Sequence, residues 1–161
     1  MAQLSKDRLL DRLTDAGHLF AAAVYGLTQE QMGYIFEGSD GWTSVGDVVR
    51  HLIGAERGML TVAQRCAAGE EPPGYEGFDL DRWNARQVEK LRALTPAQAL
   101  DKLQAVRQET LSTLVDLTDE QIALPASHPF WGSVTVGELF RIIAIHQEMH
   151  RKDVVKMRGS M

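Results

Sequence analysis

Two histidines, His146 and His150, stand four residues apart in the segment RIIAIHQEMHRKDV, residues 141–154. Side chains four apart on a helix project side by side, so two imidazoles can each give one nitrogen to the same metal ion. Burying an imidazole costs free energy unless the ring has a partner. The pair therefore indicates either a metal site or two hydrogen-bonded core histidines. In alternating steps of three and four, the inward seam of this segment reads Val136, Leu139, Ile143, His146, His150, Asp153 and Met157.

A third imidazole, His51, lies in an earlier helical segment. It follows the predicted helix cap Ser44 by seven residues, whereas His146 and His150 follow the cap Thr135 by eleven and fifteen. At about 100° per residue these offsets share a face, and at about 1.5 Å per residue His51 lies roughly 10 Å from the start of its helix. His150 lies a similar distance from the end of its own. Antiparallel packing would bring the rings level, so we hypothesise a metal site on His51, His146 and His150.

Two other kinds of zinc site are excluded by the surrounding residues. A zincin needs glutamate directly after the first histidine, and position 147 is glutamine. A zinc finger needs several cysteines, and the chain has only Cys66. The other histidines, His18 and His128, share no spacing with the three, so we expect them to be structural or at the surface.

Four further side chains are candidates for supporting this site or lining a pocket beside it. Asp153 could orient a ligand histidine through its second ring nitrogen, or it could be a buried salt-bridge acid. Asp47 stands one turn before His51 and is also well placed to cap its helix. Trp42 and Trp83 lie near helix ends and could wall a pocket over the metal, although aromatic residues there also serve simple packing.

The elements that must position these residues are helices. LTQEQM, LTPAQA and LTDEQI each place a threonine three residues before a glutamine, which is typical of a helix start. Proline is tolerated in a first turn but not in the middle of a helix, so the third helical region should break near Thr95 and Pro96. Its two parts could stack end to end. PASHPFWGS is predicted to be a loop, with GSVTV a weak strand candidate. Helices are expected over Ser5–Tyr25, Ser44–Ala68, Leu80–Leu117 and Thr135–Met157.

The sequence thus predicts an all-α fold with four main helices in one bundle. Antiparallel packing of the second and fourth helices requires the second and third to run the same way, so their connection must travel the length of the bundle. The eleven residues from Gly69 to about Asp79 could span it, because at up to roughly 3.3 Å each they reach about 36 Å.

Composition bounds the class of protein. The 161 residues are 44% hydrophobic and 24% charged, so residues 1–161 are expected to form a single domain. A net charge of −5 without a basic stripe argues against a nucleic-acid partner. No apolar run of about 18 residues predicts a membrane span, and the first residues lack the apolar stretch of a signal peptide. With one cysteine, which fits a reducing compartment, we expect a cytoplasmic protein.

Three segments resemble a known family. GWTSVGDVVRHLIGAERGML, residues 41–60, resembles the second-helix segment of the DinB/YfiT-like superfamily, where a Trp-Thr pair opens a helix that carries a metal-binding histidine. TVGELFRIIAIHQEMHRKDV, residues 135–154, resembles its last helix with the His-x-x-x-His pair. FDLDRWNARQVEKLRALTPAQAL, residues 78–100, resembles the third-helix region of the mycothiol-dependent maleylpyruvate isomerase branch. That branch typically has glutamate at the position of His146, so the histidine here resembles the general DinB pattern.

The resemblance implies an up-down-down-up four-helix bundle with a divalent metal on His51, His146 and His150. Three neutral histidines leave a coordination position open for a thiol or a water, which the metal would deprotonate. The resemblance then implies thiol-dependent S-transfer to a small-molecule substrate, with mycothiol or bacillithiol as the donor. Zinc or nickel is the expected metal, because both accept imidazole ligands.

Two other functions stay open from the residues alone. A metal-dependent hydrolase would need a general base near the metal, for which Asp47, Asp153 and Glu56 are the candidates. A non-catalytic metal-binding bundle, or one that uses its helices to form a homodimer, would need no base at all.

Overall fold

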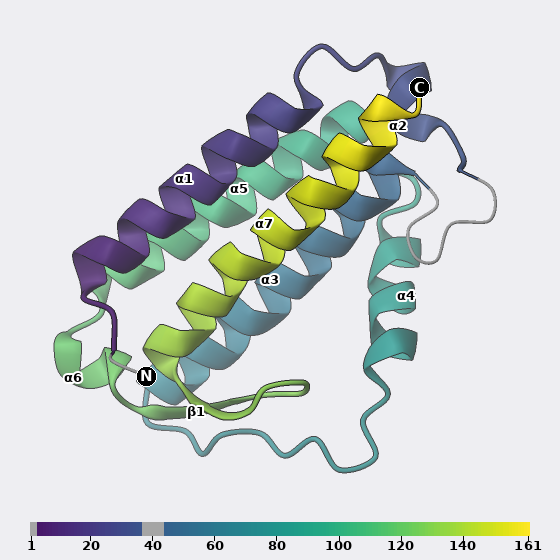
Figure 1. The fold of residues 1–161 in the computed structure, drawn as a ribbon. Coiled ribbons are helices and arrows are strands. Elements are labelled where there is room, and N and C mark those ends of the chain that lie inside the picture. Colours follow the sequence, from purple (N-terminus) through teal and green to yellow (C-terminus); the bar gives the residue numbers. More distant parts are fainter. Residues whose placement is uncertain (1–2, 37–43) are drawn as a thin grey trace.

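The computed structural model describes residues 3–36 and 44–161. Four long helices, α1, α3, α5 and α7, pack side by side as a bundle, with α4 outside it and a small hairpin across one end (Figure 1). The predicted all-α four-helix bundle is confirmed. The elements are α1 (Lys6–Val24), α2 (Gln29–Gly33), α3 (Val45–Ala67), α4 (Leu80–Lys90), α5 (Pro96–Asp116), α6 (Asp119–Ile122), β1 (Pro125–His128), β2 (Gly132–Thr135) and α7 (Val136–Gly159).

Side-chain caps start these helices where the sequence indicated. Ser44 accepts a hydrogen bond from the backbone N–H of Asp47 and begins α3. All three threonine–glutamine patterns form reciprocal capping boxes, although two of them open only the short helices α2 and α6. Thr135 and Glu138 form the same box at the start of α7, which fixes the rotational phase of the helix that carries two of the three histidines.

The long helices run up, down, down and up in chain order, as predicted. In Figure 1, α1 and α7 ascend while α3 and α5 descend, so α3 lies antiparallel to α7 and parallel to α5. Because parallel neighbours begin at the same end of the bundle, the chain must return along its full length between α3 and α5.

The return is made by a helix, which corrects two expectations about residues 69–117. The loop before α4 crosses only the lower end of the bundle, and α4 itself climbs beside α3 (Figure 1). The two parts of the third helical region therefore do not stack end to end. Pro96 has no N–H to give to a continuing helix, so the chain turns between Lys90 and Pro96. Arg50 of α3 holds that turn by donating to the carbonyl oxygens of Leu91 (3.2 Å) and Leu94 (2.7 Å).

Close packing of α4 on α3 depends on two glycines four residues apart. A Cβ atom at Gly54 would lie 2.6 Å from Cβ of Gln87, and one at Gly58 would lie 2.9 Å from Cη2 of Trp83. Neither distance is possible between real carbon atoms, so only glycine allows α4 to lie this close. The indole of Trp83 is thereby set against α3, one to two turns after His51.

The core consists of two hydrophobic clusters with buried polar residues between them along α3, α5 and α7. One cluster contains Leu60, Leu114 and Phe140, and the other contains Val49, Val106 and Val154. Between the clusters, the buried polar residues are Glu56, Arg107, Thr110 and Gln147. The carboxylate of Glu56 accepts from Nε and Nη2 of Arg107, at 2.8 and 2.9 Å, and from the hydroxyl of Thr110 at 2.7 Å.

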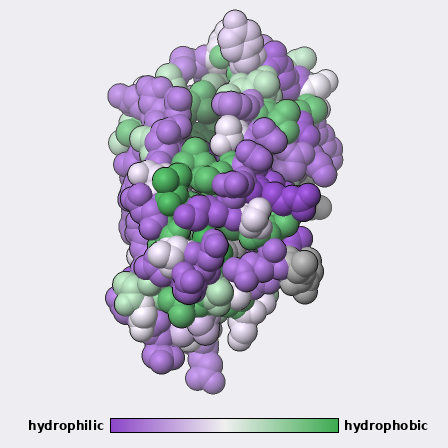
Figure 2. Space-filling model, turned by 90° about the vertical axis from the view of Figure 1, so that its left-hand side faces the viewer, coloured by the Kyte–Doolittle hydropathy of each residue, from purple (hydrophilic) through white to green (hydrophobic). Residues whose placement is uncertain are grey.

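The outer face formed by α1 and α5 is mainly hydrophilic. Figure 2 shows it with a strip of hydrophobic side chains exposed between hydrophilic flanks, where a groove runs between the two helices. In residues 3–36 and 44–161, no helix combines the length and hydrophobicity that crossing a bilayer would need.

The segment PASHPFWGS, predicted to be a loop, instead forms most of a hairpin. β1 pairs antiparallel with β2, with Ala126 opposite Val134 and His128 opposite Gly132, whose φ of 72° closes the turn. The weak strand candidate GSVTV is confirmed, because β2 covers its first four residues. Each strand has only four residues without a clean alternation of apolar and polar side chains, so the strand signal in the sequence is weak. The hydroxyl of Ser127 donates to the carbonyl of Pro73 at 2.7 Å and ties the hairpin to the loop before α4.

Replacing Glu56 with glutamine should lower the free energy of unfolding by about 3 kcal/mol, because Arg107 would keep a buried charge without its counter-ion. Urea denaturation followed by circular dichroism measures this loss. The matched control is Glu109→Gln, which removes the exposed pair of Arg57 and Glu109 and should cost less than about 1 kcal/mol. Equal losses in the two variants would contradict the importance assigned to the buried pair.

Candidate metal centre

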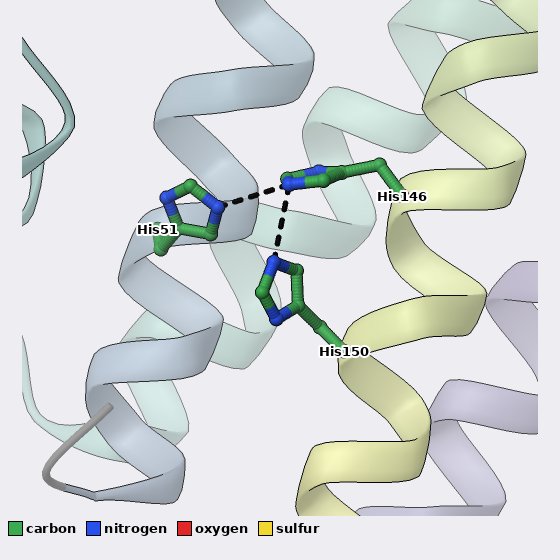
Figure 3. A group of neighbouring side chains, drawn as sticks. All are labelled: His51, His146 and His150. Carbon is green, nitrogen blue, oxygen red and sulfur yellow. Dashed lines mark hydrogen bonds between the residues drawn. The ribbon is translucent and has the colours of Figure 1, made fainter. Parts of the chain in front are cut away.

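Three imidazoles meet between α3 and α7. Nε2 of His146 lies 3.0 Å from Nε2 of His51 and 3.1 Å from Nε2 of His150 (Figure 3). The ring centroid of His51 is 4.8 Å from that of each of the other two. The predicted convergence of His51 with the pair four residues apart is therefore what the antiparallel helices produce.

The three Nε2 atoms are better arranged to bind a cation than to form hydrogen bonds with one another. A neutral imidazole nitrogen carries either a hydrogen or a lone pair, so Nε2 of His146 cannot make a full hydrogen bond to both neighbours at once. A zinc ion at 2.0–2.1 Å from each nitrogen in a tetrahedral site would place neighbouring ligand nitrogens about 3.3–3.4 Å apart, a few tenths of an ångström more than the two separations here. Within the described residues, this is also the group of side chains whose ligand atoms converge closely enough for a metal. The residues present thus fit a divalent ion.

Burial favours the neutral rings that metal ligation requires. It lowers the pKa of His51 from 6.5 to about 2 and that of His146 from 6.5 to about 3, and the charges of the neighbouring histidines act in the same direction. Burial also lowers the pKa of His150, although its hydrogen bond to Asp153 opposes the shift. Each ring is therefore neutral at pH 7 and has one lone pair to offer a cation without first losing a proton.

Asp153 lies where the first of its two predicted roles needs it. Its Oδ2 lies 2.8 Å from Nδ1 of His150, so the carboxylate accepts the Nδ1–H and leaves the lone pair of Nε2 facing the cluster. The alternative, a buried salt-bridge acid, does not fit, because the Asp153 side chain is 51% exposed and Arg151 pairs with Glu148 at 2.7 Å.

The other three supporting candidates have different outcomes. Asp47 is buried in the first turn of α3, where its Oδ1 accepts from Arg50 at 3.1 Å and from Arg92 at 2.6 Å. Trp83 lines the pocket described next. Trp42 lies outside the described residues.

An apolar pocket of about 350 Å³ opens beside the cluster, with His51 and His146 in its wall. Its walls come from α3, the loop before α4, α4, the hairpin and α7. Among the described residues that line it there is no aspartate, glutamate, lysine or arginine. Five aromatic side chains contribute to the lining: Tyr75, Phe78, Trp83, Phe130 and Trp131.

Comparison with known proteins assigns the chain that carries this centre to a family. The family model described as the DinB superfamily matches residues 8–154. The chain belongs to the DinB superfamily. A relative from Oceanobacillus iheyensis, named as a candidate metal-dependent hydrolase, is 25% identical over 149 residues, which cover 92% of this chain and 83% of the relative.

Solved structures of low sequence identity share the DinB fold of this chain. YfiT from Bacillus subtilis, described as a probable metal-dependent hydrolase with an unusual four-helix bundle topology, matches with a TM-score of 0.78 at 21% identity, over 100% of this chain and 90% of that one. A mycothiol-dependent maleylpyruvate isomerase also matches at 0.78, with 12% identity over 96% of this chain and 63% of that one.

A third structure bears on the exclusion of nucleic acid. The colibactin self-resistance protein ClbS, solved in complex with double-stranded DNA, matches with a TM-score of 0.78 at 19% identity over 96% of each chain. A protein of the same fold was thus solved bound to DNA. The expectation that this DinB protein has no nucleic-acid partner is therefore unsupported.

One pocket residue of this DinB protein was missed by sequence reasoning. His128 was expected to be structural or at the surface, but its ring lines the pocket with His51 and His146. Spacing could not find it, because β1 and not a helix carries it. The available signal was composition: the loop HPFW sets a histidine beside two exposed aromatic residues.

The depressed pKa values make the stability of the metal-free DinB protein pH-dependent. In the unfolded chain these histidines titrate near 6.5, so below that pH the unfolded state binds more protons than the folded state. Stability is therefore fully present above about pH 6.5 and falls as the pH drops toward 3, by about 1.4 kcal/mol per pH unit for each histidine. Urea midpoints measured in the presence of a chelator at several pH values between about 5 and 7.5 report this slope.

A histidine variant isolates the effect of the cluster. His51→Gln should show a shallower pH dependence than the unmodified chain, whereas His18→Gln, which changes an exposed residue of α1, should run parallel to it. Identical slopes in all three proteins would mean that burial does not control the titration of His51.

Proposed function

We propose that this DinB protein is a metal-dependent enzyme whose divalent ion is held by His51, His146 and His150, and that it transfers a low-molecular-weight thiol to a small electrophile. The observation that carries the proposal is the convergence of three Nε2 atoms at an apolar pocket. The thiol donor is mycothiol or bacillithiol, in keeping with the fold shared with the mycothiol-dependent isomerase. Zinc or nickel suits the three imidazoles.

A bound divalent cation would supply Lewis acidity at its open position, which lowers the pKa of a thiol or water there. The protein supplies the rest. The Nε2 atoms of His51, His146 and His150 face one another, and Asp153 fixes the tautomer of His150. The aromatic walls exclude water and would bind the apolar part of an electrophile.

The state of the carboxylates favours thiol transfer over hydrolysis. Attack by water needs a general base within reach, and the sequence offered three candidates. Glu56 is committed to Arg107, Asp47 to Arg50 and Arg92, and Asp153 to His150. The metal would lower the pKa of a bound thiol as it would that of a bound water, but hydrolysis also uses a general acid or base to protonate its leaving group, and these carboxylates are already engaged.

Metal-dependent hydrolysis is the second candidate. It is favoured by the names of two relatives. Under this function the same three histidines hold the metal, and a water replaces the thiol.

Metal content and activity are to be measured on one sample, purified without a nickel column. We expect about one divalent ion per chain and conjugation of mycothiol or bacillithiol to a fluorogenic bimane halide, with glutathione as the comparison thiol. His146→Ala should lose the ion and lower the conjugation rate by about 100-fold or more. His18→Ala, on the exposed face of α1, should change neither.

The other outcomes separate the alternatives. Hydrolysis of p-nitrophenyl esters that depends on the metal, without thiol conjugation, would establish the hydrolase instead. Loss of folding on metal removal, with neither activity present, would make the ion structural. A chain that binds no divalent ion after purification and after zinc or nickel addition would overturn the proposal.

The role of Asp153 has its own test. Asp153→Ala should weaken metal affinity by about 10- to 100-fold, because His150 would lose the acceptor that holds its Nδ1–H. Competition with a metal-binding dye measures the affinity. Glu148→Gln, on the same helix but paired with Arg151, removes a similar charge and should leave the affinity within about twofold. Equal weakening by both variants would point to net charge and not to the hydrogen bond.

A further inference from the structure

Among the described residues that line the pocket, His128 has its tautomer fixed by hydrogen bonds from the backbone. Its Nδ1 accepts hydrogen bonds from the backbone N–H groups of Phe130 at 3.1 Å and Trp131 at 3.2 Å. Both donors come from the turn between β1 and β2, so Nδ1 must carry a lone pair. Burial lowers the pKa of His128, which keeps the ring neutral at pH 7. A neutral ring without a hydrogen on Nδ1 carries it on Nε2.

The Nε2–H has no acceptor among the residues that the structure describes. The Nδ1 edge faces the turn, which leaves the Nε2 edge for the pocket that the ring lines. Other polar groups nearby are already engaged, because the hydroxyl of Tyr75 is hydrogen-bonded to Ser127, which in turn donates to Pro73. His128 also lies near enough to His146 for a charge on it to be felt there.

We infer that the pocket takes a neutral, mainly apolar molecule with one hydrogen-bond acceptor, such as an aromatic ketone, and that His128 donates its Nε2–H to that acceptor. The aromatic and aliphatic lining accommodates the apolar body, and the lack of charged side chains among the lining residues gives an ionic group no partner away from the histidine cluster. The inference rests on the proposed function in one respect: this molecule is the electrophile that reacts at the cluster.

Two substitutions separate the two functions of the His128 ring, which are to donate Nε2–H to the bound molecule and to accept at Nδ1 from the turn. His128→Asn places an amide oxygen near the position of Nδ1, so it can keep the contacts to the two backbone N–H groups while removing the donor. His128→Gln can extend an amide N–H toward the position of Nε2 but does not match Nδ1. The probes are 2-acetylnaphthalene and 2-isopropenylnaphthalene, which have nearly the same shape and differ by C=O against C=CH2.

The measurement is equilibrium binding of each probe by tryptophan quenching, with zinc and again in chelator. The quantity compared is the dissociation constant of the alkene divided by that of the ketone. This ratio should be roughly 3- to 10-fold larger in the unmodified protein and in His128→Gln than in His128→Asn. The control is Asn84→Ala, which removes a different hydrogen-bonding side chain from the pocket lining and should keep the ratio of the unmodified protein.

Three results would overturn the inference: no binding of either probe, an unchanged ratio in His128→Asn, or a preference for the ketone that disappears in chelator. The last would mean that the metal, and not His128, takes the carbonyl oxygen. Binding in chelator does not depend on catalysis, so a failure of thiol transfer with the ratio intact would refute the proposed function and leave this inference standing.

Discussion

The antiparallel pairing of α3 with α7 is the constraint on which the rest of this structure depends. His51 lies near the start of α3, and His146 and His150 lie in the middle turns of α7, so opposed helices bring the three rings to one level. With α3 antiparallel to α7 and parallel to α5, a short turn cannot join α3 to α5. The long crossover is thus a geometric consequence of placing the histidines together.

That crossover supplies the walls of the site. A connection of loop alone would leave the open side of α3 exposed, whereas α4 covers it and brings Trp83 to the pocket. Two glycines of α3 allow the close approach, and Arg50 anchors the end of α4 through backbone carbonyls. The hairpin closes another side and is bound to the same loop through Ser127. The pocket is therefore built mainly by elements outside the four-helix core.

The buried polar side chains of the described bundle fall into two different arrangements. Glu56, Arg107 and Thr110 satisfy one another between the two hydrophobic clusters. The three imidazoles instead bring their Nε2 atoms together, and the carboxylate of Asp153 fixes the tautomer of one of them. This difference separates a polar layer that stabilises the fold from a cluster that suits a cation.

Local chemistry in the sequence determined the helix starts and the inward faces, because caps and a period of 3.6 residues act within a few turns. It also placed Asp153 three residues after His150 on one helix, where the two side chains can bond. The helix positions of His51, His146 and His150 predicted their meeting and the direction of the helices that carry them, and antiparallel packing realises it. Tertiary packing alone decided that α4 runs back beside α3 and that His128 joins the pocket. Those outcomes depend on contacts such as Arg50 with Leu91, 41 positions apart, and Ser127 with Pro73, 54 positions apart. They also depend on a hairpin too short to leave a periodic pattern in the chain.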